Sequence, residues 1–284
     1  MSEIVTNAAD VQAASEEPTP IIFLDDVKVT FKTRTGSLLH PNKVHAVRGL
    51  TLKLMPGETI GIVGESGCGK STTANVMCGL QKPTEGRVFF KGKDVTNRTA
   101  ADRRTIGRVI SVVFQDPATA LNARMSVRDQ LMDPMIVHKV GDEAYRNQRV
   151  NELIEMVGLP ESVLDALPGQ MSGGQRQRVA IARALALKPD AIIADEPTSA
   201  LDVSVRAQIL NLLMDLKKEL NLAMVFISHD IQTVRYISDR IIVMNGGLAV
   251  EEGTAEEVFN NPKDEYTRLL LGAAPSLLHP DLGK

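Results

Sequence analysis

The segment Gly64-Glu65-Ser66-Gly67-Cys68-Gly69-Lys70-Ser71 decides the fold of this chain. It has the form G-x-x-x-x-G-K-[ST], in which glycines let the backbone wrap around a polyphosphate and turn its N–H groups inward. Residues 58–63 before it are β-branched and apolar, which predicts a buried strand, and residues 71–80 predict a helix that ends near Gly79. A strand, this loop and a helix in that order predict a nucleoside triphosphate site, because the helix N-terminus adds partial positive charge.

Two side chains of the loop have predicted roles, and a third has two interpretations. Lys70 is expected to reach the β- and γ-phosphates, and the Ser71 hydroxyl to ligate Mg²⁺. A thiol at Cys68, near a lysine and a helix N-terminus, would gain thiolate character, or the position simply requires a small side chain. Cys78 is expected to be buried and inert. The residues expected to bind the nucleotide through this motif are Gly64, Glu65, Ser66, Gly67, Cys68, Gly69, Lys70, Ser71 and Thr72.

Composition limits the class of protein. With 284 residues, 43% of them hydrophobic and 24% charged, the chain suits one large domain, alone or with a subdomain. A net charge of −3 gives no argument for nucleic-acid binding, and no apolar run approaches the ~18 residues of a membrane span. The first twenty residues carry four acidic side chains and no Lys or Arg, unlike a secretory signal, and two cysteines make no disulfide framework. We therefore expect a soluble cytosolic protein.

Hydrophobic patterning predicts an α/β fold with a helical insert. Residues 1–20 lack periodicity and are expected to be disordered. Two strands of antiparallel type, 21–31 and 44–54, are predicted before the phosphate loop, with 33–42 as a loop between them. Further strands are predicted at 86–92, 109–114, 191–195, 223–227 and 241–244, and helices within 126–158 and at 175–187, 205–220 and after the capping box 254–257. This order predicts a P-loop core with a mainly parallel sheet, helices on both faces, an N-terminal antiparallel β region and a helical subdomain at about 118–186.

A second motif follows the apolar strand at 191–195. This strand delivers Asp195 and Glu196 at its carboxyl end, where ligands of parallel sheets bind. Asp195 is expected to hold Mg²⁺, directly or through water, and Glu196 to orient or deprotonate a water that attacks the γ-phosphate. Asp-Glu-Pro is a common turn after a strand, but downstream of a phosphate loop it indicates nucleotide hydrolysis.

The third motif is Met171-Ser172-Gly173-Gly174-Gln175, followed by an Arg- and Ala-rich helix. It resembles the signature motif of ATP-binding-cassette (ABC) ATPases, whose usual first residue is Leu. A serine and two glycines at a helix start leave N–H groups and a hydroxyl for an anion. In that family two cassettes pack head to tail, so the resemblance implies that Ser172, Gly173, Gly174 and Gln175 reach the nucleotide of a partner cassette.

Other family elements occur in order along the chain. The resemblance implies that Gln115 senses Mg²⁺ and the attacking water and faces a transmembrane partner, that Asp202 lies at the cassette dimer interface, and that His229 contacts the γ-phosphate. Phe31 is the candidate for stacking on adenine; Phe23 is an alternative, and packing in the core is a third interpretation. The catalytic set implied is Glu196, His229, Gln115 and Lys70, and the metal set is Ser71, Gln115 and Asp195.

The resemblance covers residues 21 to about 271, with the cassette domain at 21–259 and a C-terminal tail at 260–284. The segments 64–71, 114–117 and 200–205, and the tail segment from Asn261-Pro262 through Tyr266-Thr267 to Leu271, look like the oligopeptide, dipeptide and nickel importer branch. The tail has Asp264-Glu265 where that branch usually has His-Pro, and it has no cysteine for the iron–sulfur cluster of some members.

The resemblance implies the ATP-binding and ATP-hydrolysing subunit of an importer, with ATP and Mg²⁺ as cofactors. Its expected partners are a second cassette, identical or homologous, two permease subunits and, indirectly, an external binding protein. It would lie peripherally on the cytoplasmic face of the membrane. Peptides, nickel chelates and oligosaccharides remain open as substrates. The alternative class is a non-transport cassette acting on DNA or ribosomes, but such proteins usually carry long coiled-coil insertions or two cassettes per chain.

Overall fold

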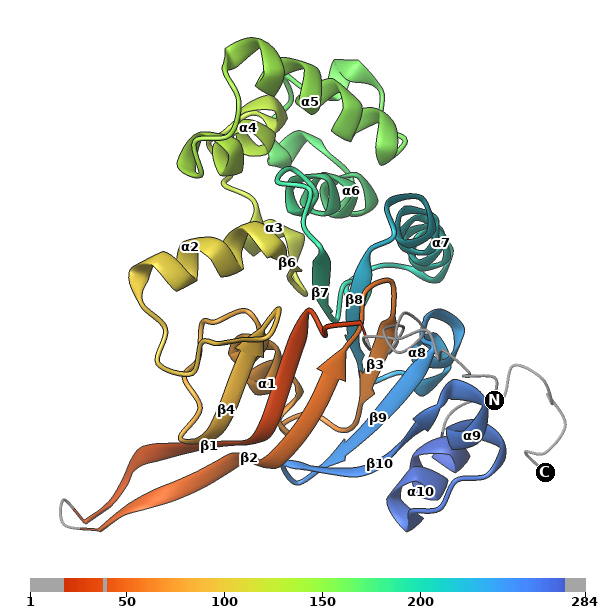
Figure 1. Ribbon diagram of the computed structural model, residues 1–284. Coiled ribbons are helices and arrows are strands. Elements are labelled where there is room, and N and C mark those ends of the chain that lie inside the picture. The colour runs from red at the N-terminus through yellow and green to blue at the C-terminus, as the bar shows by residue number, and fades with distance from the viewer. Residues whose placement is uncertain (1–17, 38–39, 274–284) are drawn as a thin grey trace, which may run out of the picture.

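The computed structural model describes residues 18–37 and 40–273 of the chain. The segment expected to be disordered, 1–20, lies outside the described residues as far as residue 17, and residues 18–20 form no helix or strand. Two sheets form the lower part of the molecule in Figure 1, and a group of helices stands above them. No helix within the described ranges combines the length and apolar character needed to cross a membrane.

The larger sheet has six strands and carries the predicted parallel core. Its order is β10-β9-β3-β8-β7-β6, and every neighbouring pair is parallel except β9 with β10. The predicted mainly parallel sheet is therefore confirmed. Its strands are β3 (Thr59–Val63), β6 (Ile110–Val113), β7 (Ala191–Asp195), β8 (Ala223–Ser228), β9 (Arg240–Asn245) and β10 (Leu248–Thr254).

The smaller sheet is antiparallel, as predicted for the N-terminal region, with the order β2-β1-β4-β5. The prediction of a loop at 33–42 is wrong. β1 extends to Ser37 and β2 begins at His40, and the two strands pair as a hairpin in which Gly36 lies opposite Pro41. An antiparallel ribbon satisfies its own backbone groups without an apolar face, and Pro is tolerated there because β2 is an edge strand. The strands are β1 (Ile22–Ser37), β2 (His40–Leu54), β4 (Glu85–Phe90) and β5 (Lys93–Asp94).

Alternation along β7 shows how the layers are built. Ala191 and Ile193 belong to the core that joins the two sheets and α1 (Lys70–Met77), whereas Ile192 and Ala194 belong to the core beneath the helices of the other face. Since successive side chains of a strand point to opposite faces, a strand buried on both faces is apolar throughout. Helices covering the second core are α7 (Val203–Leu220), α8 (Ile231–Ile237) and α9 (Ala255–Asn260).

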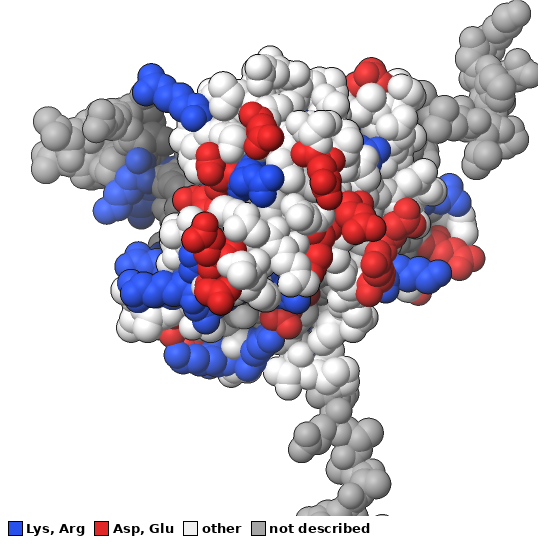
Figure 2. Space-filling view, turned by 90° about the horizontal axis from the view of Figure 1, so that it is seen from above, with Lys and Arg blue, Asp and Glu red and all other residues white. Residues whose placement is uncertain are grey.

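The predicted helical insert is present, above the sheets in Figure 1. Its helices are α3 (Pro117–Ala120), α4 (Val127–Val137), α5 (Glu143–Met156) and α6 (Gly173–Ala184), with 3-10 turns at Glu161–Val163 and Pro168–Gln170. Figure 2 looks down on the molecule from this end: acidic side chains gather across the middle of the described surface, and basic ones lie mainly toward its sides. Three further helices in the described ranges were not predicted: α2 (Ala100–Val109), α8 and α10 (Glu265–Ala273).

Candidate nucleotide site

A cavity of about 330 Å³ opens where the phosphate loop meets the carboxyl ends of the strands. Three predicted catalytic residues from other parts of the chain line it together with the loop, which brings the sequence motifs into one place. Gly64, Glu65 and Cys68 of the predicted set do not line this cavity. Its lining is Ala46, Ser66, Gly67, Gly69, Lys70, Ser71, Thr72, Gln115, Glu196 and His229.

The path of the loop depends on glycine at two positions. Gly69, the N-cap of α1, has φ +110°, and a Cβ there would collide with the carbonyl oxygen of Ala46. Gly64 has φ +157°, and a Cβ there would collide with the carbonyl oxygen of Met244. Only glycine combines this backbone conformation with such close approach. The loop is therefore packed tightly between β2 and β9 while its cavity side stays open.

Lys70 is buried and bonded to the loop that it follows. Its Nζ donates to the carbonyl oxygens of Gly64 at 2.7 Å and Glu65 at 2.9 Å, and the Sγ of Cys68 lies 3.9 Å away. An ammonium group has three N–H donors, and sulfur is a weak acceptor. Two donors thus fix the lysine, and the third is available to a phosphate oxygen.

Glu196 connects three strand ends. It follows β7 in a turn with φ +47°, in which its backbone N–H donates to the carbonyl of Ile227 on β8 at 2.9 Å. This turn directs its carboxylate into the cavity, where Oε2 accepts from the side-chain amide of Gln115 at 3.2 Å and lies 3.3 Å from Nδ1 of His229. Left-handed backbone at a non-glycine residue is a costly conformation that occurs preferentially at functional sites. The carboxylate is thus held by donors and faces the phosphate loop.

Asp195 lies deeper than Glu196. Burial raises the pKa of its carboxyl; the Ser71 hydroxyl and the Lys70 ammonium oppose that rise, and the charge of Glu196 adds to it. Its Oδ1 is buried and has no hydrogen-bond partner among the described residues. A buried carboxylate oxygen without a partner is costly unless a cation or donor completes it. The site is therefore suited to a cation beside Ser71.

The signature residues do not line the cavity formed by their own phosphate loop. Ser172 caps α6 in a capping box with Gln175, and Met171 is buried in the helical subdomain, so an apolar residue is required there, as Met or Leu. A Cβ on Gly174 would approach Val205 within 2.7 Å, so the signature packs closely on the first turn of α7. Asp202 caps that helix by accepting the N–H of Val205, which lowers the pKa of Asp202.

The two aromatic candidates for adenine stacking have different surroundings. Phe23 stacks on Phe89 of the adjacent strand with ring centroids 5.4 Å apart, under the ammonium of Lys53, so it already has a packing role. Phe31 is 40% exposed and pairs across the hairpin with exposed Val44. The structure leaves Phe31 as the available ring, and its contact with adenine stays a prediction.

The expectation of a raised thiolate fraction at Cys68 is wrong. Its side chain is 5% exposed, and burial raises the pKa of the thiol despite the opposing charge of Lys70. The ammonium is directed toward the carbonyls of Gly64 and Glu65, so desolvation of the thiol dominates. Cys78, which was expected to be buried, is only partly buried, and desolvation raises the pKa of its thiol to about 12.

Comparison with known proteins decides the family. The profile described as "ABC transporter" matches residues 47–199, more than half of the chain. The chain belongs to the ABC transporter family. This cassette is 46% identical over 265 residues to the oligopeptide transport ATP-binding protein AppF of Bacillus subtilis, covering 93% of this chain and 80% of that protein. It is 42% identical over 262 residues to the dipeptide transport ATP-binding protein DppF of Haemophilus influenzae, covering 92% and 80%.

Solved cassettes share the fold. The ABC cassette MJ0796, in a dimeric post-hydrolysis state bound to ADP and Pi, matches with a TM-score of 0.73 and 33% identity over 82% of this chain and 98% of that one. The chain is thus an ABC ATPase, and the family, fold and enzyme class expected from its motifs are confirmed.

Two residues at the site of this ATPase were missed in the sequence. Ala46 lines the cavity from β2, and Tyr266 on α10 bonds to the phosphate loop. Nothing in the local pattern distinguishes Ala46. Tyr266 lies in the tail segment that resembles the peptide importer branch, which was the available indication.

Proposed function

We propose that this chain is the ATP-hydrolysing subunit of an importer for oligopeptides or dipeptides. The observation that carries the proposal is the 42–46% identity, over more than nine-tenths of the chain, to proteins named as oligopeptide and dipeptide transport ATP-binding subunits. Nickel chelates and oligosaccharides are the competing substrates. Their discrimination belongs to the permease and an external binding protein rather than to the nucleotide site.

The hydrolytic step is assigned to the residues around Glu196. Its carboxylate would orient a water and accept its proton as the water oxygen bonds to the γ-phosphorus and the bond to ADP breaks. The N–H donor of Gln115 and the ring of His229 contact that carboxylate at 3.2 and 3.3 Å, and the ring would contact the γ-phosphate. Lys70 and the N–H groups at the start of α1 bind the phosphates.

Mg²⁺ is proposed to be held by Ser71, Gln115 and Asp195. No group of three or more His, Cys, Asp or Glu side chains in the described ranges forms a metal cage. That finding is compatible with Mg²⁺, which takes one or two carboxylates, waters and substrate phosphates. The partnerless Oδ1 of Asp195 beside Ser71 fits this arrangement. When bound, the ion would neutralise charge on the β- and γ-phosphate oxygens.

A second cassette is proposed to complete the site. Ser172, Gly173, Gly174 and Gln175 start α6 at a distance from the cavity of their own chain, so a partner's signature would close over it, with Asp202 at the interface. The solved cassette MJ0796 is described as dimeric. ATP would close the pair and hydrolysis would reopen it, either as two copies of this chain or with a homologue.

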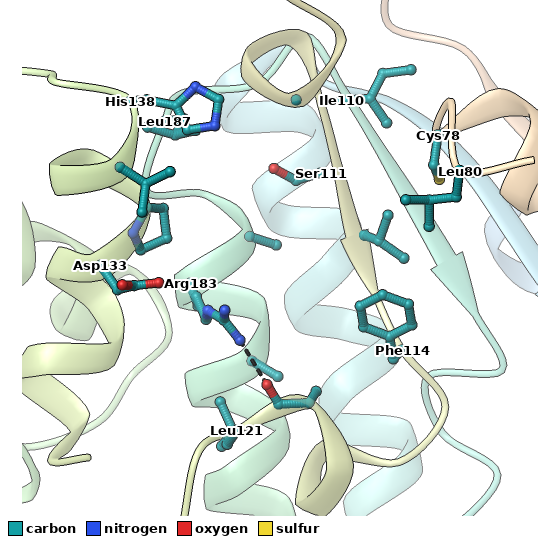
Figure 3. A pocket seen from close by; sticks show the side chains of 17 residues that line it. Cys78, Leu80, Ile110, Ser111, Phe114, Leu121, Asp133, His138, Arg183 and Leu187 are labelled. Atoms are coloured by element: carbon teal, nitrogen blue, oxygen red, sulfur yellow. Dashed lines mark hydrogen bonds between the residues drawn. The ribbon is translucent and has the colours of Figure 1, made fainter. Parts of the chain in front are cut away.

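The permease is proposed to dock in the groove between the core and the helical subdomain (Figure 3). This groove has a volume of about 360 Å³, and the exposed ring of Phe114, directly before Gln115, forms part of its wall. Across the groove, Arg183 donates to the carbonyl of Ala120 at 2.6 Å and ties α6 to α3. A permease helix seated here would contact the segment that carries Gln115 to the nucleotide. This contact would couple ATP hydrolysis to movement of the permease, and it would hold the subunit at the cytoplasmic face of the membrane.

The decisive experiment is peptide uptake in the source organism. Deleting the gene should abolish uptake of radiolabelled di- and oligopeptides, and wild type, but not Glu196→Gln, should restore it. Normal peptide uptake in the deletion strain contradicts the peptide assignment. Loss of nickel or oligosaccharide uptake instead identifies the competing substrate.

The non-transport alternative is not favoured by the relatives. Nor does the face of the molecule seen in Figure 2 carry a continuous basic patch of the kind typical of nucleic-acid binding. Affinity purification of the tagged chain should recover membrane-spanning partners; recovery of ribosomes or DNA in their place contradicts the proposal.

A further inference from the structure

The C-terminal helix α10 is fixed to the core by one buried carboxylate. Glu251 of β10, 9% exposed, accepts the backbone N–H groups of Lys263 at 2.8 Å and Asp264 at 3.0 Å. Asp264 in turn accepts the N–H of Tyr266 at 2.9 Å. Charge-assisted bonds to backbone N–H groups are among the stronger ones in proteins. The start of α10 is therefore held in a defined place beside β10.

This anchoring brings one side chain to the phosphate loop. The hydroxyl oxygen of Tyr266 accepts the backbone N–H of Glu65 at 2.9 Å, across 201 positions of sequence. The carbonyl of the same residue, Glu65, accepts from Nζ of Lys70 at 2.9 Å. Glu65 thus lies between the tyrosine and the lysine that is expected to bind phosphate.

The loop has a second tether from the same part of the chain. The N–H of Gly247, in the turn between β9 and β10, donates to the carbonyl of Cys68 at 3.0 Å. Both tethers come from behind the loop, away from the side that lines the cavity, since neither Glu65 nor Cys68 is part of that lining. They restrain the loop without occupying the space of the nucleotide.

We propose that Tyr266 is a positioning residue for ATP binding, acting through Glu65 on Lys70. The N–H of Glu65 and the carbonyl of Gly64 belong to one planar peptide group, and this carbonyl accepts from Nζ of Lys70 at 2.7 Å. With the hydroxyl of Tyr266 present, that peptide group keeps the orientation in which its carbonyl holds the lysine. Without the hydroxyl, the N–H loses its partner and the lysine loses a fixed acceptor. The inference concerns ATP binding alone and does not depend on the transported substrate.

Loss of the Tyr266 hydroxyl should weaken binding of the ground state and of the transition state equally, because Lys70 holds the phosphates in both. An interaction of that kind raises KM when it is lost and leaves kcat unchanged. Loss of one neutral hydrogen bond corresponds to roughly a 3- to 10-fold change. A merely structural role would instead lower the folded fraction, and with it the apparent kcat.

The test uses the full-length chain with Tyr266→Phe and the matched control Tyr236→Phe. Tyr236, on α8, donates its hydroxyl to Asn211 at 2.9 Å and has no part in the site. Steady-state ATPase assays and titration with a fluorescent ATP analogue should give a 3- to 10-fold higher KM and Kd for Tyr266→Phe, with kcat within about 2-fold. Tyr236→Phe should match wild type. An unchanged KM in Tyr266→Phe, or a fall in kcat that parallels a fall in Tm, overturns the proposal.

A double-variant cycle tests the route through α10. Glu251→Gln should raise KM as well, by loosening the helix that presents the tyrosine. Because both residues act through one hydrogen bond to Glu65, Tyr266→Phe with Glu251→Gln should raise KM no further than the larger single effect. Fully additive effects would show independent actions and would contradict the proposed route.

Discussion

The carboxylate of Glu196 lies 3.3 Å from Nδ1 of His229, and the two residues follow neighbouring parallel strands, β7 and β8. They are brought together by strand order, since the chain between them forms α7 and β8. Gln115 reaches the same carboxylate from the end of β6, the next strand outward. The ends of three neighbouring strands thus bring the carboxylate of Glu196, the amide of Gln115 and the ring of His229 together, facing the phosphate loop.

Replacing Glu196 by Gln should reduce ATP hydrolysis roughly 10²- to 10⁴-fold, because a positioned base is lost. Binding of ATP should persist, since Lys70 and Asp195 are intact, and the trapped nucleotide should hold two cassettes together on gel filtration. Glu252→Gln is the matched control, because Glu252 pairs with Arg240 at 3.0 Å outside the site. Turnover of Glu196→Gln close to that of the control would remove Glu196 from its assigned role.

Ser172→Arg should leave ATP binding to the monomer intact but stop dimer closure and turnover, because the signature is proposed to act on the partner's nucleotide. Loss of the helix cap alone is controlled by Ser126→Arg, since the Ser126 side chain likewise accepts the backbone N–H three residues on, at the start of α4 in the same subdomain. Mixing Ser172→Arg with Lys70→Ala chains should restore part of the activity, because each mixed dimer has one intact composite site. Wild-type activity in Ser172→Arg by itself would refute the assignment in trans.

Asp195→Asn should raise the thermal stability of the nucleotide-free chain at pH 7.5 while abolishing Mg²⁺-dependent turnover. Burial raises the pKa of Asp195, so the folded state loses stability as pH rises from the usual carboxyl pKa through the raised one. Above the usual carboxyl pKa the folded state bears this cost, and the amide, which has no charge to bury, removes it. Scanning calorimetry should show a rise in Tm of about 2–4 °C for each kcal/mol gained in the free energy of unfolding.

The matched control is Asp190→Asn, at the other end of β7, where the carboxylate pairs with Lys91 on the surface at 2.9 Å. Exposed pairs contribute about 0–1 kcal/mol, so its Tm should stay level or fall slightly. The advantage of Asp195→Asn should also disappear when the pH falls below the usual carboxyl range. A Tm for Asp195→Asn equal to or below wild type at pH 7.5 would contradict the burial argument.

Cys68 should react with an alkylating reagent more slowly than a free thiol at pH 7.5, because burial raises its pKa. The rate should rise with pH, and Mg-ATP should protect, since bound phosphates restrict the loop. Cys78, with a pKa of about 12, should react later still. Peptide mapping by mass spectrometry after brief labelling measures both sites.

Cys78→Ala serves as the control. The alkylating reagent should inactivate its ATPase at the wild-type rate, because modification of Cys68 causes the loss of activity. Faster labelling of Cys68 than of a free thiol, or labelling indifferent to nucleotide, would count against this description of the loop.

Much of the nucleotide site could be predicted because most of its residues lie in short contiguous motifs. A phosphate loop needs glycines and a lysine at fixed spacing, and a catalytic carboxylate needs an apolar strand to deliver it. Residues 64–71 therefore predicted a loop between a strand and a helix, and residues 191–196 predicted a strand that ends in two carboxylates. The two-sided burial of β7 likewise follows from its uniformly apolar sequence.

The errors lie where long-range contacts outweigh local pattern. Residues 33–42, with Gly36 and Pro41, have the composition of a loop, yet pairing between two strands makes them part of a hairpin. Cys68 has a lysine two residues away, but the folded loop directs that lysine to carbonyl oxygens and buries the thiol. Local sequence gives the neighbours of a group in the chain but not its exposure to water.

By itself, the sequence determined the class of the fold and the family and named the candidates for the catalytic groups, because each depends on residue types at short, fixed spacing. Only the tertiary structure decided which groups meet: Gln115, Glu196 and His229 converge because β6, β7 and β8 are neighbours in one parallel sheet. It also placed Tyr266 against Glu65, a contact over 201 positions. Such contacts depend on the summed packing of a whole core, so no short segment of the sequence contains them.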